Sequence, residues 1–165
     1  MELIETVELA SSASSITFSS IPQTYTDLCL VFSLRSDRSG NGDYVAFAFN
    51  GSTAGFTSVG LYNFSTTIVT QTDLDRYATI PSAGSVSNTF GNGQTYISNY
   101  SGNTNKSFST DGVFGDGGNI NASLWSNTAA ITSIEFSPAI GSTFNQYSII
   151  SLYGITAGSG GATVS

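Results

Sequence analysis

Residues 25–35 read YTDLCLVFSLR, and this stretch decides the fold class. Every second side chain belongs to one apolar set, which consists of Leu28, Leu30, Phe32 and Leu34. A period of two residues over this length predicts a β-strand rather than a helix. The intervening residues are also apolar at the middle of the stretch, so we expect this strand to lie in the interior of a sheet.

The residues that follow predict a turn and then a second strand. Residues 35–42 (RSDRSGNG) are polar and glycine-rich, which is typical of a connecting loop. Residues 44–50 alternate again, with one apolar set formed by Val45, Phe47 and Phe49. Asn50 and Gly51 then predict a tight turn, because both residue types tolerate a positive φ.

Short alternating segments recur along the rest of the chain. Further strands are predicted over residues 3–9, 15–19, 61–70, 76–80, 95–100, 107–111, 120–125, 131–136 and 147–155. Loops are predicted over residues 88–93 and 112–119, and a single helical turn over residues 127–130. We therefore expect an all-β protein, a single antiparallel β-sandwich of about eight to ten strands with a jelly-roll-like order. This domain spans residues 1–156, and a Gly/Ser-rich C-terminal tail spans residues 157–165.

The composition excludes several kinds of chemistry. Ser, Thr, Gly and Asn make up 78 of the 165 residues, charged residues only 9%, and the chain has one Cys, one Lys and no His. A His-based catalytic triad, a His metal site and a CxxC pair are therefore impossible within this chain. The formal net charge is −7 with four basic residues, so neither nucleic acid nor an anionic membrane surface is an expected partner.

Several side chains that could carry chemistry have a structural interpretation as well. Cys29 lies in an apolar stretch and is expected to be buried. Trp125 is expected in the core, with an interface anchor as the alternative. Lys106 lies in a polar run with no Ser-x-x-Lys placement, so a serine nucleophile has no evident base. Arg35, Asp37 and Arg38 could form a local ion-pair cluster after the central strand.

Three pairs of acids are candidates for a glycosidase or calcium site. Asp73 with Asp75 is the candidate for a glycosidase site, and Asp111 with Asp116 and Asp37 with Asp43 are the candidates for a calcium site. Paired carboxylates serve glycosidases, and carboxylate-bearing loops bind calcium. None of the pairs fits an EF-hand pattern, so we interpret them as loop and turn residues. The sequence assigns no catalytic, metal-binding or cofactor-binding residue and predicts a protein that is not an enzyme.

Three segments and the opening MELI carry a family resemblance. The segments are residues 20–38 (SIPQTYTDLCLVFSLRSDR), 123–138 (SLWSNTAAITSIEFSP) and 144–155 (FNQYSIISLYGI). Together they resemble a family of small β-sandwich virion proteins of tailed bacteriophages that infect marine bacteria and cyanobacteria. The resemblance implies a virion component assembled in the host cytoplasm, and a homo-oligomer, by analogy a trimer.

Three roles follow as hypotheses. The first is a capsid decoration protein that binds the major capsid protein and braces the shell. The second is a tail or fibre module that recognises host surface glycans through aromatic residues such as Tyr62, Tyr96 and Tyr100. The third is a polysaccharide depolymerase that uses Asp73 with Asp75 or Asp111 with Asp116. The sequence favours the first role, with the second as its alternative.

Overall fold

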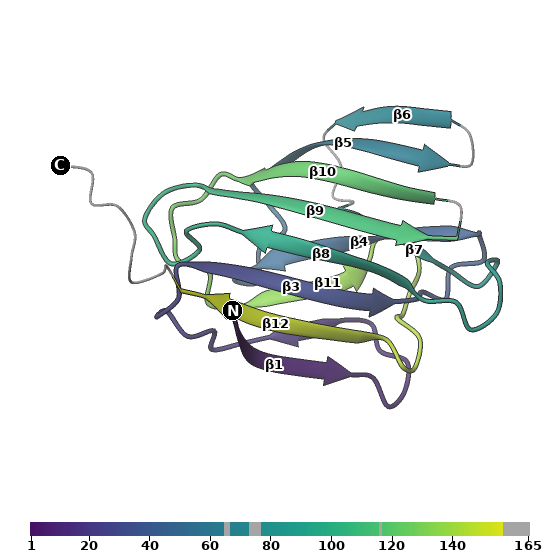
Figure 1. Ribbon diagram of the computed structural model, residues 1–165, viewed down its shortest axis with the longest axis horizontal. Helices are drawn as coiled ribbons and strands as arrows, with labels where there is room; N and C mark the ends of the chain where they lie inside the picture. Colours follow the sequence, from purple (N-terminus) through teal and green to yellow (C-terminus); the bar gives the residue numbers. More distant parts are fainter. Residues whose placement is uncertain (65–66, 73–76, 116, 157–165) are drawn as a thin grey trace.

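The computed structural model describes residues 1–64, 67–72, 77–115 and 117–156. These residues form twelve strands and no helix, arranged in two antiparallel sheets (Figure 1). The larger sheet has the order β1-β12-β3-β8-β9-β10-β5-β6, and the smaller one has the order β2-β11-β4-β7. The large sheet consists of β1 Glu2–Glu8, β12 Ile149–Ile155, β3 Asp27–Leu34, β8 Gly91–Ile97, β9 Lys106–Phe114, β10 Gly117–Trp125, β5 Phe56–Phe64 and β6 Thr67–Thr72. The small sheet consists of β2 Ile16–Phe18, β11 Ile134–Pro138, β4 Gly42–Phe49 and β7 Ala78–Pro81.

The all-β sandwich predicted from the sequence is confirmed. The predicted central strand is β3, which pairs with β12 on one side and β8 on the other. Its apolar set Leu28, Leu30, Phe32 and Leu34 is buried against the small sheet, with at most 2% of any side chain exposed. A jelly-roll order is not confirmed, since the strands divide eight to four between the sheets.

Strand β4 supplies the facing layer of the core. Its alternate residues Val45, Phe47 and Phe49 are buried as the pattern predicts. Asn50 and Gly51 form the predicted turn, with φ values of 54° and 73°, and Phe49 exchanges backbone hydrogen bonds with Ser52 across it.

Aromatic rings fill the space between the sheets. Phe47 stacks on Tyr77 with ring centroids 4.7 Å apart, and Phe136 meets Phe47 edge-on at the same separation. Trp125 is buried and packs edge-on against Phe49. Its predicted role in the core is thereby confirmed.

Four local predictions were wrong. Residues 61–70 form no single strand, because β5 begins earlier at Phe56 and β6 returns beside it as a hairpin, which helps to raise the strand count to twelve. Residues 112–119 form no long loop, since β9 and β10 continue as a paired ladder to Phe114 and from Gly117. The loop expected at residues 88–93 ends early because β8 begins at Gly91. Residues 127–130 lie in irregular backbone and form no helical turn.

The tail predicted over residues 157–165 lies outside the described residues, as do residues 73–76. In Figure 1 the small sheet lies behind the large one, so the face of the large sheet turned to the viewer is its outer face. The strands β1 and β6 form the two opposite edges of that sheet.

Candidate functional site

Strand β10 has an inverted pattern of polar and apolar residues. Asn119, Asn121 and Ser123 point inward and are buried, whereas Ile120 between them is 67% exposed. A strand on a protein surface normally directs its apolar side chains to the core and its polar side chains to water. The inversion therefore needs a reason on each face of the sheet.

The inner face provides a structural reason for the buried amides. Thr79 of β7 donates its backbone N–H to Asn119 Oδ1 at 2.7 Å and its hydroxyl to the same oxygen at 3.0 Å. The side-chain amides of Asn119 and Asn121 each donate to the Tyr77 carbonyl at 2.8 Å. Because β7 is an edge strand of the small sheet, these amides satisfy backbone groups that would otherwise be buried without partners.

Glycines let the two sheets approach closely at this point. A Cβ atom on Gly112 would lie 2.8 Å from the carbonyl oxygen of Thr79, so β9 tolerates no larger residue there. A Cβ atom on Gly60 would overlap the Asn121 side chain, which lies across β5 and donates to the Tyr62 hydroxyl at 2.8 Å. The polar junction between the sheets thus depends on small residues in β5 and β9.

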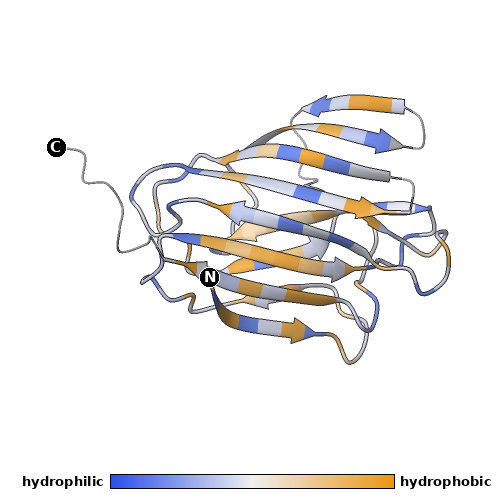
Figure 2. Ribbon diagram, viewed as in Figure 1, coloured by the Kyte–Doolittle hydropathy of each residue, from blue (hydrophilic) through white to orange (hydrophobic). Residues whose placement is uncertain are grey.

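The outer face of the same strands has no comparable internal reason for its composition. Five large apolar side chains on this face are 51% to 72% exposed, and we call them the apolar strip: Val59, Leu61, Ile68, Val113 and Ile120. The strand register places Leu61 beside Ile120, and a shallow hollow lies between Leu61, Ile68 and Ile120. Asp111, opposite Ile120 on β9, is the charged residue that borders it. Figure 2 shows the apolar bands on β5, β6 and β10, with β10 alternating between blue and orange.

This surface resembles a contact surface more than a solvated one. Exposed apolar side chains scattered singly are ordinary, but a contiguous group of them marks sites of protein or ligand contact. One signal in the sequence points to it, namely the alternation Asn-Ile-Asn at residues 119–121. That alternation does not reveal which set faces inward, so the strip was missed.

The structure brings Asp37 and Asp43 together, as backbone-binding residues. Asp37 Oδ1 accepts the N–H groups of Ser142 and Thr143 at 2.7 and 3.0 Å. Asp43 accepts those of Ile140 and Gly141 through its two oxygens, at 3.2 and 2.9 Å. Partial burial acts to raise the pKa of Asp37, but the N–H donors outweigh it and hold that pKa below its usual value. These acids hold one loop in place, but Asp43 itself is a buried residue of β4 and not a turn residue.

The other two acid pairs include residues that the structure does not describe. Asp73, Asp75 and Asp116 lie outside the described residues, and Asp111 is half-buried on the outer sheet face. Among the described residues, no group of three or more Cys, Asp or Glu side chains is placed to hold a metal ion.

The two arginines predicted to form an ion-pair cluster bind backbone carbonyls instead. Arg35 is buried and donates to the carbonyls of Ser85, Val86 and Thr89 at 3.2, 2.9 and 2.8 Å, which fixes the loop after β7. Arg38 donates to the carbonyl of Gly42 at 2.6 Å. The predicted cluster is therefore wrong, because the guanidinium groups serve loops whose carbonyls lack ladder partners.

Lys106 is fully buried, although it lies in a polar run of sequence. Its ammonium group donates to the carbonyls of Gly102, Thr104 and Thr128. Burial lowers the pKa of this amine. The side chain closes two loops on each other and is sealed from any substrate.

Cys29 is buried as predicted. Its burial, and to a smaller extent the charge of Asp111, raises the pKa of its thiol.

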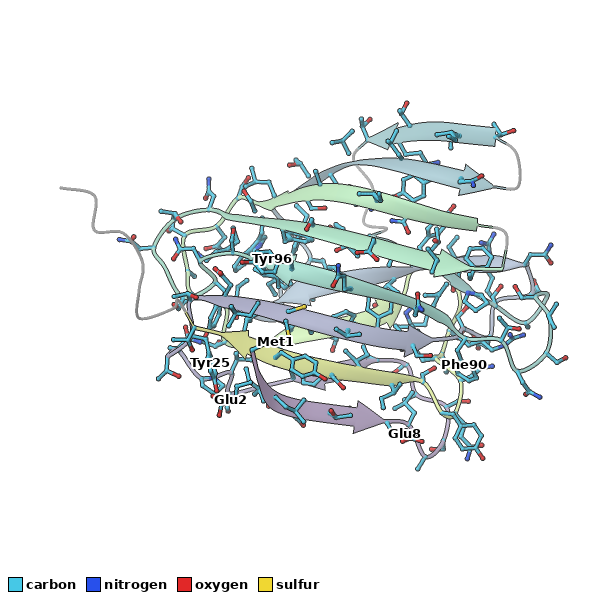
Figure 3. All side chains as sticks on the ribbon, viewed as in Figure 1. Met1, Glu2, Glu8, Tyr25, Phe90 and Tyr96 are labelled. Carbon is cyan, nitrogen blue, oxygen red and sulfur yellow. The ribbon has the colours of Figure 1, made fainter. Side chains whose placement is uncertain are left out.

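The three tyrosines proposed for glycan stacking do not form one surface. Tyr62 and Tyr100 are buried in the interior, while Tyr96 on β8 is 38% exposed. Figure 3 labels Tyr96 on the outer sheet face, where its hydroxyl donates to Asp27 at 2.6 Å, and this hydrogen bond raises the pKa of the phenol.

The comparisons with known proteins add no relative. No protein-family model matches the chain, and neither a curated protein nor a solved structure matches it. In the part of the chain that the structure describes, no helix has the length and apolar character needed to cross a membrane.

Proposed function

We propose that this protein is a non-enzymatic structural component that binds another protein through the apolar strip. From the resemblance of its sequence segments, we propose that the assembly is the virion of a tailed bacteriophage. In this role the chain is a capsid decoration protein that binds the major capsid protein, and it assembles as a homo-oligomer in the host cytoplasm.

One observation carries the proposal: β10 buries the polar residues Asn119, Asn121 and Ser123, whereas Ile120 on β10 and Leu61 on β5 are exposed. The buried amides have a structural task in binding β7, whereas the exposed Leu61 and Ile120 have none among the residues that the structure describes. Burying one such side chain contributes about 1.5–3 kcal/mol. A partner that covers the strip thus recovers stabilisation that the isolated fold leaves unused.

The character of the surface also supports a protein partner. The strip lies on a sheet face, and four of its five aliphatic side chains line the hollow, together with polar residues such as Asn63 and Ser109. Among the described residues that line it, the charged one is Asp111 at its border. Large sugars and charged polymers need hydrogen-bond donors and acceptors, which aliphatic side chains lack, whereas the centre of a protein interface is depleted in charge.

The test uses paired threonine substitutions on the outer sheet face. Thr keeps β-propensity at exposed strand positions, so Leu61→Thr/Ile120→Thr should fold and should bind shells of the major capsid protein at least roughly tenfold more weakly. Val31→Thr is the matched control, because Val31 is exposed on the same face but lies on β3, away from the strip. Cosedimentation with purified shells measures binding. Equal binding by the wild type and the double variant would refute the role of the strip.

The place of the protein on the particle is tested separately. An antibody against the chain should label the icosahedral shell of intact particles, and decorated shells should resist heat better than stripped ones. Label confined to the tail would contradict the decoration role, and absence of label on accessible particles would contradict the virion role.

A glycan-binding tail module remains the second candidate, supported by the surface around Tyr96. Its exposed ring lies beside the hydroxyl-bearing residues Ser98, Ser107 and Ser109 in a shallow depression. An aromatic ring with neighbouring hydroxyls can stack on a sugar and hydrogen-bond to it. Binding to host envelopes that is blocked by soluble polysaccharide and lost in Tyr96→Ala would favour this role over the first.

A further inference from the structure

Strand β6 is an open edge of the large sheet. It is the last strand in the sheet order, and its sequence TIVTQT contains no charged residue, no Pro and no Gly. All of its residues except Gln71 are β-branched, which favours extended backbone. An edge strand presents a row of unpaired N–H and C=O groups that can pair with another strand.

The opposite edge of the sheet is protected. Strand β1 carries Glu2, Glu5 and Glu8, all exposed, and its register with β12 shifts between Leu3 and Glu5. Figure 3 labels Glu2 and Glu8 at the two ends of this strand. Charged side chains and irregular register are the devices by which proteins block pairing at sheet edges. Strand β6 has neither device over Thr67–Thr72.

Net charge limits where two copies of this chain can meet. Each copy carries eleven acids against four basic residues, so two copies repel each other in general. An approach through β1 would bring two sets of glutamates together. An approach through β6 brings together two strands without charge.

We propose that β6 pairs antiparallel with β6 of a second copy of this chain, which gives a two-fold dimer with one continuous sheet. The same surface is used by both copies, as closed two-fold assembly requires. The dimer goes beyond the proposed function, because it is made by backbone groups of an edge strand and does not depend on a virion.

The pleat of the sheet limits the register of the dimer. Directly opposed residues in an antiparallel pair share a face, and faces alternate along a strand. In a symmetric pair the axis must therefore pass beside a residue, and Val69 or Thr70 lies at the middle of the six-residue strand. With the axis at Val69, Ile68 opposes Thr70 of the partner; with the axis at Thr70, Ile68 opposes Thr72.

This arrangement also extends the apolar strip. A two-fold axis between antiparallel strands is perpendicular to the sheet, so the outer faces of both copies point the same way. Ile68 and Leu61 of one copy then continue into the same residues of the other across the new β6 pair. The dimer offers a partner one strip of twice the length.

The test places a lysine on the β6 edge, and the same substitution on the β1 edge is its control. Thr70→Lys places a charge on the exposed outer face of β6, and in either register the two copies bring these charges to the axis or to positions diagonally across it. Thr6→Lys makes the same change on β1, and successive strand registers place Thr6 and Thr70 in the same row across the sheet. Sedimentation of the full chain should give twice the mass of 17.1 kDa at micromolar concentration.

We expect Thr70→Lys to raise the dimer dissociation constant at least roughly tenfold and Thr6→Lys to leave it unchanged. A wild-type monomer, a trimer, or a dimer that only Thr6→Lys weakens would overturn the proposal. Hydrogen exchange on the wild type provides the second measurement, in case Thr70→Lys does not fold. The backbone amides of β6 should become protected as the concentration rises, and protection that is independent of concentration would also overturn it.

The dimer and the proposed function can be refuted independently of each other. Leu61→Thr/Ile120→Thr changes β5 and β10, which are not at the edge, and should leave the dimer intact while it weakens binding to shells. A dimer that does not bind shells refutes the proposed function alone. A monomer that binds shells refutes the dimer alone.

Discussion

The two ends of the large sheet distribute their polar and apolar residues in opposite ways. Toward β1, the inner face carries aliphatic residues such as Leu30 and Leu152, and the edge carries three glutamates. Toward β6, the inner face carries the amides of β10, and the outer face carries the apolar strip. The first end therefore buries apolar residues and exposes charged ones, as a solvated surface does. The second end exposes apolar residues, as a contact surface does. A single sheet thus separates the part that stabilises the fold from the part for which we propose a contact.

The largest effect is expected when the protected edge is made to resemble the open one. Glu2→Thr/Glu5→Thr/Glu8→Thr leaves two uncharged edges per chain, and pairing at both produces open-ended assemblies instead of a closed dimer. Light scattering should show a mass that grows with concentration. The triple change moves the net charge from −7 to −4, and Asp27→Asn/Asp111→Asn/Glu135→Gln moves it equally away from this edge. The control should retain the wild-type mass, and a triple variant with that same mass would contradict the protective role of β1.

Substitutions in the interior of the two ends are expected to have a smaller effect than the change at the edge. The loss of stability should be larger at the β1 end than at the β6 end. Leu30→Ala removes buried aliphatic volume under β3 and should lower the free energy of unfolding by about 3 kcal/mol. Asn119→Ala deprives the backbone of β7 of two hydrogen bonds and should lower it by about 2 kcal/mol. Urea unfolding measures both.

Asn92→Ala, an exposed asparagine on the outer face of β8, is the control for the interior asparagine and should stay within about 0.5 kcal/mol of the wild type. If Asn119→Ala also fell within that range, the amides of β10 would not be the structural link between the sheets.

The end of the sheet that carries the core was predictable from the sequence, and the other end was not. Alternation in β3 and β4 identified the strands and the buried sets, because large aliphatic and aromatic residues alternate with smaller or polar ones. In β10 both sets alternate equally well, and only the neighbouring edge of β7 decides that the asparagines face inward. The glycines at residues 112–119 suggested a loop, whereas several of them lie in strands where another strand or ring approaches closely. Such partners are distant in the sequence, so no local pattern reports them.

The smallest expected effect concerns an acid that accepts hydrogen bonds from a loop, in contrast to the acids at the sheet edge. The pKa of Asp37 is lowered in the folded state, because its carboxylate accepts the N–H groups of Ser142 and Thr143. Its contribution to stability is therefore complete above the ordinary pKa of an aspartate and is lost as the pH falls through the lower, folded value. Asp37→Asn should be slightly less stable at neutral pH and should lose less stability between about pH 4 and pH 2. Ser142→Ala keeps the backbone donor and should follow the wild type. If the free energies of unfolding of Asp37→Asn and the wild type fell equally across this pH range, Asp37 would not contribute to the loss of stability at low pH. The distinction between edge acids and loop-binding acids would then not hold.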